Sequence, residues 1–254
     1  MQVVQVACVQ LATCHLLLEL IMNWINQAEQ IGVRLTAVNQ EQFTRYLNLL
    51  MEWNGRMNLT AVREPAAIES RHFLDSLTCA PLMGDLNGAR LIDVGTGAGF
   101  PGLPLKILYP EMQLTLVESV GKKTRFLQAV VEELELTNVT ILPERAEALG
   151  QQRAHREQYD WAVARAVAAL PTLAEYLLPF CKVGGHMLAQ KGRKAAEETA
   201  VSHHAITLLG GGAPTLHPVT VTDDGTTMIL VEKIKRTPKL YPRSIGTPKK
   251  TPLS

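Results

Sequence analysis

Four glycines lie close together in the stretch DVGTGAGFPG, residues 93–102. Glycine tolerates positive backbone φ angles and lets a ligand approach the main chain closely. Gly97, Gly99 and Gly102 have the Gly-x-Gly-x-x-Gly spacing of a phosphate-binding loop. The helix expected next would offer free N–H groups to an anion, and Pro101 suits the first turn of that helix. The spacing alone is also compatible with a purely structural turn.

The overlapping Gly95, Gly97 and Gly99 have a second spacing, which is typical of the loop that holds S-adenosylmethionine in class I methyltransferases. The bound anion would then be the carboxylate of a methionine moiety rather than a pyrophosphate. Glu118 ends the next apolar segment, LTLVES, where a carboxylate could accept both hydroxyls of an adenosine ribose. NAD and S-adenosylmethionine share that nucleoside, so Glu118 favours a nucleoside ligand without separating the two. A glutamate at a strand end is also often only solvated surface.

Two later segments supply further candidate binding residues. The stretch PERAEAL places Ala146 and Glu147 where the edge of an adenine could be recognised. Arg165 follows the fourth expected strand, in VARAV, where it could lie at the rim of the ligand site. An arginine among alanines could equally form a surface ion pair.

The cysteines and histidines give no indication of a metal site. The four cysteines lack Cys-x-x-Cys spacing and a disulfide framework, and the seven histidines are scattered without a His-Glu-x-x-His motif. Metal catalysis is therefore not expected, and the cysteine usage fits the reducing cytoplasm. Cys181 could serve as the nucleophile of a cytosine C5 methyltransferase, but its setting in LLPFCKVGG favours core packing.

Hydrophobic periodicity predicts helices that alternate with short apolar strands. Asn39 is expected to cap the first helix, with Gln42 completing a capping box. Helices are expected over residues 39–54, 65–84, 101–109, 121–135, 170–181 and 193–209. Strands are expected over residues 89–95, 113–119, 139–144, 159–167, 184–192, 215–221 and 227–234, the last two joined as a hairpin through Asp223-Asp224-Gly225. This alternation indicates an α/β fold with a mostly parallel sheet, helices on both faces, and ligand loops at the carboxyl ends of the strands.

The length of the chain separates the two ligands. A nicotinamide-dependent dehydrogenase usually needs a catalytic domain beyond its dinucleotide-binding half, and only residues 193–254 remain after the fifth strand. That remainder is predicted to be one helix, a hairpin and a tail. Methyl transfer needs little more than the sheet domain, because the sulfonium already activates the methyl group and the enzyme mainly aligns the reactants. S-adenosylmethionine is therefore the favoured ligand.

The two ends of the chain differ from its body. The formal net charge is +1, yet residues 233–254 hold seven basic residues and no acidic one. Such a tail suggests a polyanion partner, and a solvated disordered tail is the alternative. Residues 1–21 are apolar but broken by polar residues, and they fit neither a signal peptide nor a membrane span. We expect translation to start at Met22, with residues 1–21 as an extension without function.

Several longer motifs together resemble one known family. The motifs are NGRMNLTAV, RHFLDSL, LIDVGTGAGFPGLPL, ARAV and the tail KRTPKLYPRSIGTPKKTPL, between residues 54 and 253. They are similar to those of the glucose-inhibited division protein B family, whose members methylate guanine N7 in small-subunit (16S) ribosomal RNA of bacteria. The resemblance covers about residues 22–253, and the GFPG loop and the tail are its most specific parts.

The resemblance implies a class I, Rossmann-like methyltransferase fold: a seven-stranded, mostly parallel sheet with a C-terminal antiparallel hairpin and a small N-terminal helical cap. It implies a cap over residues 22–85, an S-adenosylmethionine-binding domain over 86–234 and a basic tail over 235–254. The implied cofactor-binding positions, with the glycines of the loop added, are Gly95, Gly97, Gly99, Phe100, Glu118, Ser119, Val120, Ala146, Glu147 and Arg165. The residues expected to contact RNA are Arg165, Lys235, Arg236, Lys239, Arg243, Lys249 and Lys250.

The expected reaction assigns no catalytic general base. Guanine N7 has an in-plane lone pair and needs no deprotonation, and the fourth strand leads into VARAVAAL rather than the (N/D/S)PP(Y/F) motif of exocyclic-amine methyltransferases. We expect a cytoplasmic, monomeric protein that acts on small-subunit ribosomal RNA or the ribosomal subunit and does not enter a membrane. A catalytically silent ribosome-assembly or RNA-binding protein with the same fold, and a nicotinamide-dependent oxidoreductase, are the alternatives.

Overall fold

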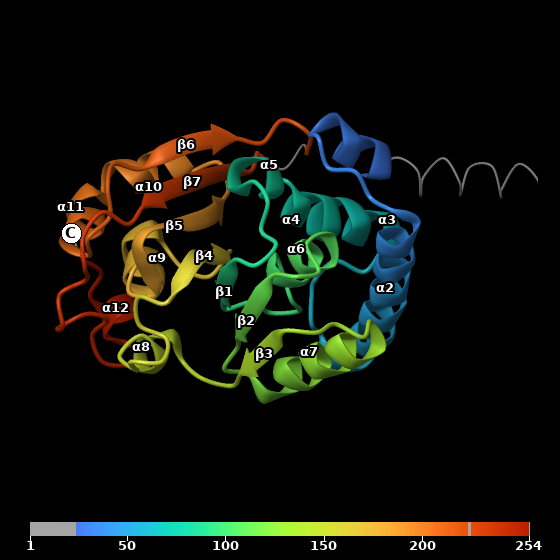
Figure 1. Ribbon diagram of the computed structural model, residues 1–254, viewed down its shortest axis with the longest axis horizontal. Coiled ribbons are helices and arrows are strands. Elements are labelled where there is room, and N and C mark those ends of the chain that lie inside the picture. The colour runs from blue at the N-terminus through green and yellow to red at the C-terminus, as the bar shows by residue number, and fades with distance from the viewer. Residues whose placement is uncertain (1–23, 223–224, 254) are drawn as a thin grey trace, which may run out of the picture.

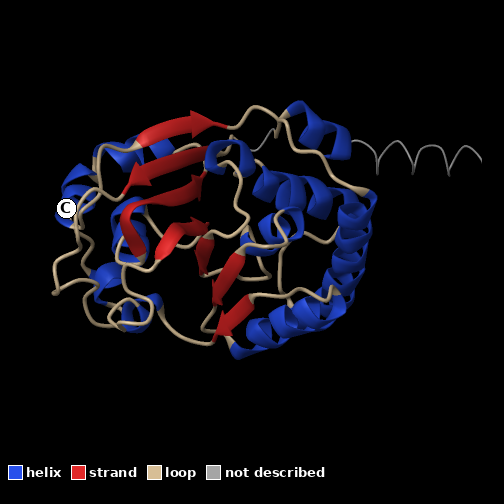
Figure 2. Ribbon diagram, viewed as in Figure 1, coloured by secondary structure: helices blue, strands red, loops and turns tan. Residues whose placement is uncertain are grey.

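The computed structural model describes residues 24–222 and 225–253. The predicted N-terminal extension, residues 1–21, lies outside the described residues, as do Asp223 and Asp224 of the predicted hairpin turn. Figure 1 shows one sheet between two groups of helices, and Figure 2 shows the strands in red crossing the centre of the molecule.

Seven strands form the sheet in the order β3-β2-β1-β4-β5-β7-β6. Their bounds are β1 Arg90–Val94, β2 Gln113–Val117, β3 Val139–Leu142, β4 Tyr159–Arg165, β5 Cys181–Lys191, β6 Thr215–Pro218 and β7 Thr227–Glu232. The first five strands pair in parallel, while β7 runs antiparallel to both β5 and β6. The mostly parallel sheet and the C-terminal antiparallel pair are therefore confirmed. Because β7 runs antiparallel to β5, its last residue, Glu232, pairs with His186 in the middle of β5, and His186 pairs with Trp161 near the start of β4.

The first long helix, α2 (Ala37–Met57), begins two residues before the predicted start. Thr36, not Asn39, is its N-cap, because Thr36 has the extended backbone that a cap requires. Asn39 holds the third helical position: its N–H donates to Thr36 Oγ1 at 3.2 Å, and its Oδ1 accepts from the Thr36 N–H at 3.0 Å. The predicted role of Gln42 is also wrong, since its amide donates to Leu134 O at 3.3 Å and so ties α2 to the sheet domain.

The single helix predicted over residues 65–84 is broken into four pieces. These are α3 (Pro65–Ile68), the π-helix η1 (Glu69–Leu74), α4 (Asp75–Leu77) and α5 (Ala80–Met83). A π-helix widens the turn and changes which side chains share a face, and such turns are frequent at functional sites. In this chain it buries Phe73 and Leu74 against the sheet domain and leaves His72 half-buried.

The remaining helices cover the two faces of the sheet. Their bounds are α6 Gly102–Leu108, α7 Gly121–Glu133, α8 Ala146–Leu149, α9 Leu170–Leu177, α10 Ala195–Ala200, α11 His203–Leu208 and α12 Thr247–Lys250. The helix predicted over 193–209 is thus two helices, and the helix predicted over 170–181 ends at Leu177. Cys181, expected at the end of that helix, opens β5 and is fully buried.

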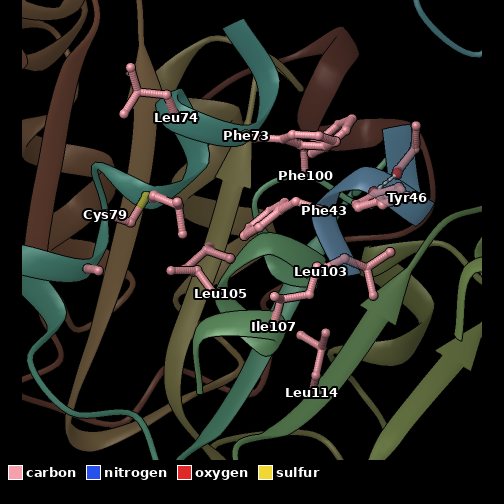
Figure 3. Packing of buried hydrophobic residues seen from close by; sticks show 14 of the residues in the cluster. Phe43, Tyr46, Phe73, Leu74, Cys79, Phe100, Leu103, Leu105, Ile107 and Leu114 are labelled. Atoms are coloured by element: carbon pink, nitrogen blue, oxygen red, sulfur yellow. Dashed lines mark hydrogen bonds between the residues drawn. The ribbon is translucent and has the colours of Figure 1, made fainter. Parts of the chain in front are cut away.

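Aromatic rings join the N-terminal helices to the glycine loop. Phe43 and Tyr46 of α2, Phe73 of η1 and Phe100 of the loop gather between these elements (Figure 3). The rings of Phe43 and Phe73 are 5.0 Å apart, and those of Tyr46 and Phe100 stack at 5.6 Å. The N-terminal helices are therefore packed directly on the element that carries the glycines.

Within residues 24–222 and 225–253, each helix is either too short or too polar to cross a membrane. The same residues contain no group of three or more histidine, cysteine, aspartate or glutamate side chains that could hold a metal ion.

Candidate cofactor and substrate site

The glycine loop connects β1 to α6 at the carboxyl ends of the parallel strands. Gly95, Gly97 and Gly99 have φ angles of 69°, 65° and 101°, a region that other residues rarely adopt. A Cβ on Gly95 would lie 2.8 Å from Val167, and one on Gly99 would lie 2.6 Å from the Tyr46 hydroxyl. A Cβ on Gly97 would meet no described atom closer than Gly95 O at 4.0 Å. Gly95 and Gly99 are thus required by the packing of the protein, whereas Gly97 faces open space.

Asp93, at the end of β1, fixes the shape of this loop. Its Oδ2 accepts from Thr96 Oγ1 at 2.7 Å and from the Gly102 N–H at 2.8 Å. Burial raises the pKa of the Asp93 carboxyl to about 7, although both hydrogen bonds oppose that shift. Its Oδ1 is buried and has no partner among the described residues. Asp93 was not among the predicted site residues, although its position two residues before the first glycine of the loop was a usable signal.

Glu118 joins the second loop to the first. Its Oε1 accepts from the Val120 N–H at 2.8 Å, and its Oε2 accepts from the Gly97 N–H at 3.2 Å. Lys123 Nζ lies 3.7 Å from Oε2 and balances part of the charge. The carboxylate is only 6% exposed, so it is a held acceptor and not solvated surface. Val120 contributes its backbone here, while its side chain is exposed.

Two cavities meet at Gly95. The smaller, of about 80 Å³, brings together predicted positions from three loops: Gly95, Glu118, Ser119, Ala146 and Glu147. The larger, of about 370 Å³, shares Gly95 with the smaller one. Its lining includes the predicted positions Gly95, Gly97, Phe100 and Arg165. Gly99 lines neither cavity, because its close neighbours are Leu103 and Tyr46. An elongated ligand could thus extend from one cavity to the other across Gly95.

Arg165 is anchored in the wall of the larger cavity. Its Nη1 donates to Asp75 Oδ2 at 2.9 Å and to Arg71 O at 3.1 Å, and its guanidinium carbon lies 4.9 Å from the centre of the Phe100 ring. The side chain is 16% exposed. Asp75 also accepts from Thr226 Oγ1 at 3.2 Å. Arg165 is therefore a partly buried ion-pair partner that connects β4 to the N-terminal helices.

His72, from η1, completes this wall. Its ring stacks on Phe100 with centres 4.7 Å apart, and its Nε2 lies 2.8 Å from Thr60 Oγ1. Its Nδ1 lies 3.0 Å from Arg71 O and 3.4 Å from Arg165 Nη2; in the tautomer that donates from Nδ1 to Arg71 O, Nε2 accepts from the threonine. Burial and the charge of Arg165 lower the pKa of His72 to about 4, so the ring is neutral at physiological pH.

The predicted basic tail folds back along the domain. After β7 it leaves from the amino edge of the sheet, the edge at which the parallel strands begin. The Lys233 N–H donates to Gly185 O, and the next residue, His186, pairs with Trp161 near the start of β4. It returns to the carboxyl edge, the edge with the two cavities: the Gly246 N–H donates to Glu147 at 3.0 Å, and Thr172 Oγ1 donates to Pro248 O at 3.0 Å. Figure 1 shows this return from β7 to α12, beside α8.

The predicted RNA-contacting residues of the tail therefore lie in different places. Lys235 and Arg236 are exposed near the amino edge, and Lys239 is exposed on the way back. Lys249 and Lys250 are exposed in α12, near the carboxyl edge. Arg243 is instead bound within the protein: its Nε and Nη2 donate to the carboxylate of Glu175, which is fully buried, at 2.9 and 2.6 Å.

Sequence comparison identifies close relatives of the chain. Residues 39–223 match the sequence profile of GidB, described as rRNA small subunit methyltransferase G. A protein of that name from Roseiflexus sp. (strain RS-1) is 49% identical over 90% of this chain and 98% of its own length. The protein of the same name from Leuconostoc citreum (strain KM20) is 46% identical over 91% of this chain and 98% of its own length.

Solved structures share the fold at low identity. A SAM-dependent methyltransferase from Aquifex aeolicus superposes with a TM-score of 0.53 at 15% identity, covering 70% of this chain and 97% of that one. A SAM-dependent O-methyltransferase from Thermotoga maritima gives 0.51 at 15% identity, covering 74% and 72%. The predicted class I methyltransferase fold is confirmed.

Proposed function

Because the chain belongs to the rRNA small subunit methyltransferase G family, we propose that it transfers a methyl group from S-adenosylmethionine to N7 of a guanine in small-subunit (16S) ribosomal RNA. The structural observation that carries the proposal is the pair of cavities that meet at Gly95. One has the carboxylate for a ribose, and the other has the space for a methyl acceptor.

The residues around Gly95 fit S-adenosylmethionine. Glu118 would accept from the ribose hydroxyls, and the smaller cavity beside Ala146 would take the adenine. The open face of Gly97 and the unpaired Asp93 Oδ1 would lie toward the methionine end, where a charged amino group needs acceptors. When bound, this cofactor supplies an activated methyl group on a sulfonium, so its positive charge ends on the methylated base.

The residues of the larger cavity are suited to alignment rather than to proton removal. Guanine N7 presents a lone pair in the plane of the base, so a base catalyst is unnecessary and geometry sets the rate. Arg165 is neutralised by Asp75, and His72 is neutral. Because burial and Arg165 lower the pKa of His72 to about 4, its neutral ring is a weak proton acceptor, and this wall is better suited to holding a base than to deprotonating it.

We place the RNA on the carboxyl edge of the sheet. Arg71 and Lys123 line the larger cavity, and Lys249 and Lys250 lie at the same edge beyond the smaller one. Cations that flank a cavity on two sides can neutralise the phosphates on both sides of one nucleotide. Lys235 and Arg236, near the opposite edge, are less suited to that role.

The proposal is tested by methyl incorporation. Purified protein and radiolabelled S-adenosylmethionine are incubated with 16S ribosomal RNA, or with small subunits, from bacteria lacking this methyltransferase. We expect label in a guanine whose glycosidic bond becomes labile after reduction, as N7 methylation causes. Calorimetry should show binding of S-adenosylmethionine and none of NAD. Cofactor binding with no label in either RNA substrate would contradict the proposal and indicate a non-catalytic RNA-binding protein.

A further inference from the structure

The larger cavity contains two aromatic rings, but only one can receive a base. Phe100 is 5% exposed and already stacks against Tyr46 and His72, so its faces are occupied by the protein. His72 is half-buried and lines the cavity. One face of its ring rests on Phe100, and both ring nitrogens have polar partners: Thr60 at Nε2, and Arg71 O and Arg165 at Nδ1. The surface that His72 offers to the cavity is therefore its second face.

We propose that the target guanine stacks on His72, so that His72 is the base-binding residue of the methyl-acceptor site. This inference rests on the proposed function, because it takes the methyl end of the cofactor to lie beside Gly97 in the same cavity. A base removed from its stack in RNA loses aromatic contacts, and a stacking ring in the enzyme restores them.

The bonds around His72 fix the ring as a platform. Thr60 binds Nε2 and Arg71 O binds Nδ1, so the ring cannot turn without breaking two hydrogen bonds. Phe100 supports it from behind, and Tyr46 supports Phe100 in turn. The stack is thus built before the substrate arrives, which reduces the entropy lost on binding.

The electrostatics of the platform suit the product of N7 methylation. The methylated guanine carries a positive charge, and the face of a neutral aromatic ring attracts a cation whereas an imidazolium would repel it. The charged groups beside His72 are Arg165 and Arg71, and Asp75 neutralises Arg165. Burial is the main cause of the lowered pKa of His72 and these cations add to it, so the ring stays neutral as the base becomes charged.

Three substitutions separate stacking from hydrogen bonding. His72→Phe keeps a ring and loses the polar bonds, His72→Gln keeps polar groups and loses the ring, and His72→Leu loses both. We expect Gln and Leu to lower kcat/KM for RNA by ~10-fold to ~100-fold, the effect of losing one base–aromatic stack, and Phe to lower it by about threefold or less. Calorimetry should give nearly the same S-adenosylmethionine affinity for all three variants, because the hydrogen bonds and ring contacts of His72 do not involve Glu118, Ala146 or Asp93, the residues proposed to hold the cofactor.

The outcomes distinguish this inference from the proposed function. If the His72→Gln variant retains activity and the His72→Phe variant does not, His72 acts through its hydrogen bonds and the stacking proposal is wrong. If all three variants lose RNA activity and cofactor affinity together, His72 only supports the fold, and the proposal is again wrong. Thr60→Val serves as a control that removes the hydrogen bond between Thr60 Oγ1 and His72 Nε2 and keeps the ring. Unmodified protein is assayed beside the variants, and its failure to label RNA would overturn the proposed function itself.

Discussion

At the scale of single residues, the three glycines of the loop differ in what requires them. Gly95 and Gly99 lack a side chain because Val167, Leu103 and Tyr46 already fill the adjoining space. Gly97 also lacks a side chain, although the protein leaves open space next to its Cα atom. The motif therefore combines two glycines kept for packing with one kept for a ligand.

This difference gives a prediction for Gly97 and Gly99. Gly97→Val should fold, with a loss of about 1–2 kcal/mol from its left-handed backbone, yet lose S-adenosylmethionine binding because its side chain enters the ligand space. Gly99→Val should instead be destabilised more strongly, because its side chain would collide with Tyr46 and Leu103. Thermal melting and calorimetry measure the two effects. Normal cofactor affinity in the Gly97 variant would contradict our placement of the ligand.

Asp93 makes stability depend on pH. Its pKa is raised in the folded protein from an ordinary 3.8 to about 7, so folding favours the protonated form. The stabilisation is fully present below pH 4 and is lost as pH rises through 7. Asp93→Asn cannot titrate, so its free energy of unfolding should fall less than that of the unmodified protein between pH 4 and 7. Denaturant titrations of both cofactor-free proteins at several pH values test this, and parallel curves would contradict it.

At the scale of elements, the sequence predicted the kind of each segment better than its boundaries. Alternating apolar runs located all seven strands, because buried strands and the turns between them leave a local pattern. The π-helix over Glu69–Leu74, which buries Phe73 and Leu74, was missed, because the spacing of apolar residues does not distinguish a π-turn from an α-turn. The cap was misassigned to Asn39 because Thr36 and Asn39 both carry suitable side chains, and only the backbone distinguishes them.

For the candidate site, the sequence predicted the residues at strand ends but not their ion-pair partners. Glu118, Ala146 and Glu147 could be selected because strand ends of a parallel sheet share one edge. The partners of Arg165 and Arg243 could not, since Asp75 and Glu175 lie 90 and 68 residues away in the sequence. Composition described the tail as a basic segment and could not show that one of its cations is bound to a buried carboxylate.

The tail is held to the domain by that ion pair. Arg243→Ala would leave the fully buried Glu175 without its cation, which typically costs about 3–5 kcal/mol of folding free energy. Lys239→Ala removes an exposed cation from the same segment and should change stability by less than about 0.5 kcal/mol. Denaturant unfolding of both variants tests the contrast. Equal stabilities would show that the ion pair does not anchor the tail.

At the scale of the whole molecule, the two edges of the sheet carry different cations. Lys249→Ala/Lys250→Ala and Lys235→Ala/Arg236→Ala each remove two positive charges from the tail, the first pair near the cavities and the second near the opposite edge. We expect the first pair to weaken RNA binding and to reduce the slope of log K against log salt by ~0.7 per lost phosphate contact. The second pair should leave the slope nearly unchanged. Equal losses would place RNA contacts along the whole tail.

Glu147 contacts both the smaller cavity and the tail, and it therefore couples ligand binding in that cavity to docking of the tail. It lines the smaller cavity, and its carboxylate accepts a hydrogen bond from the N–H of Gly246, 99 residues further along the chain. Any ligand that steadies α8 would thereby steady the tail, and by thermodynamic reciprocity a docked tail would tighten that ligand by the same factor. Protection of residues 246–250 from a protease should therefore rise with S-adenosylmethionine concentration, so the last turn of the chain would report on a cofactor that it does not touch.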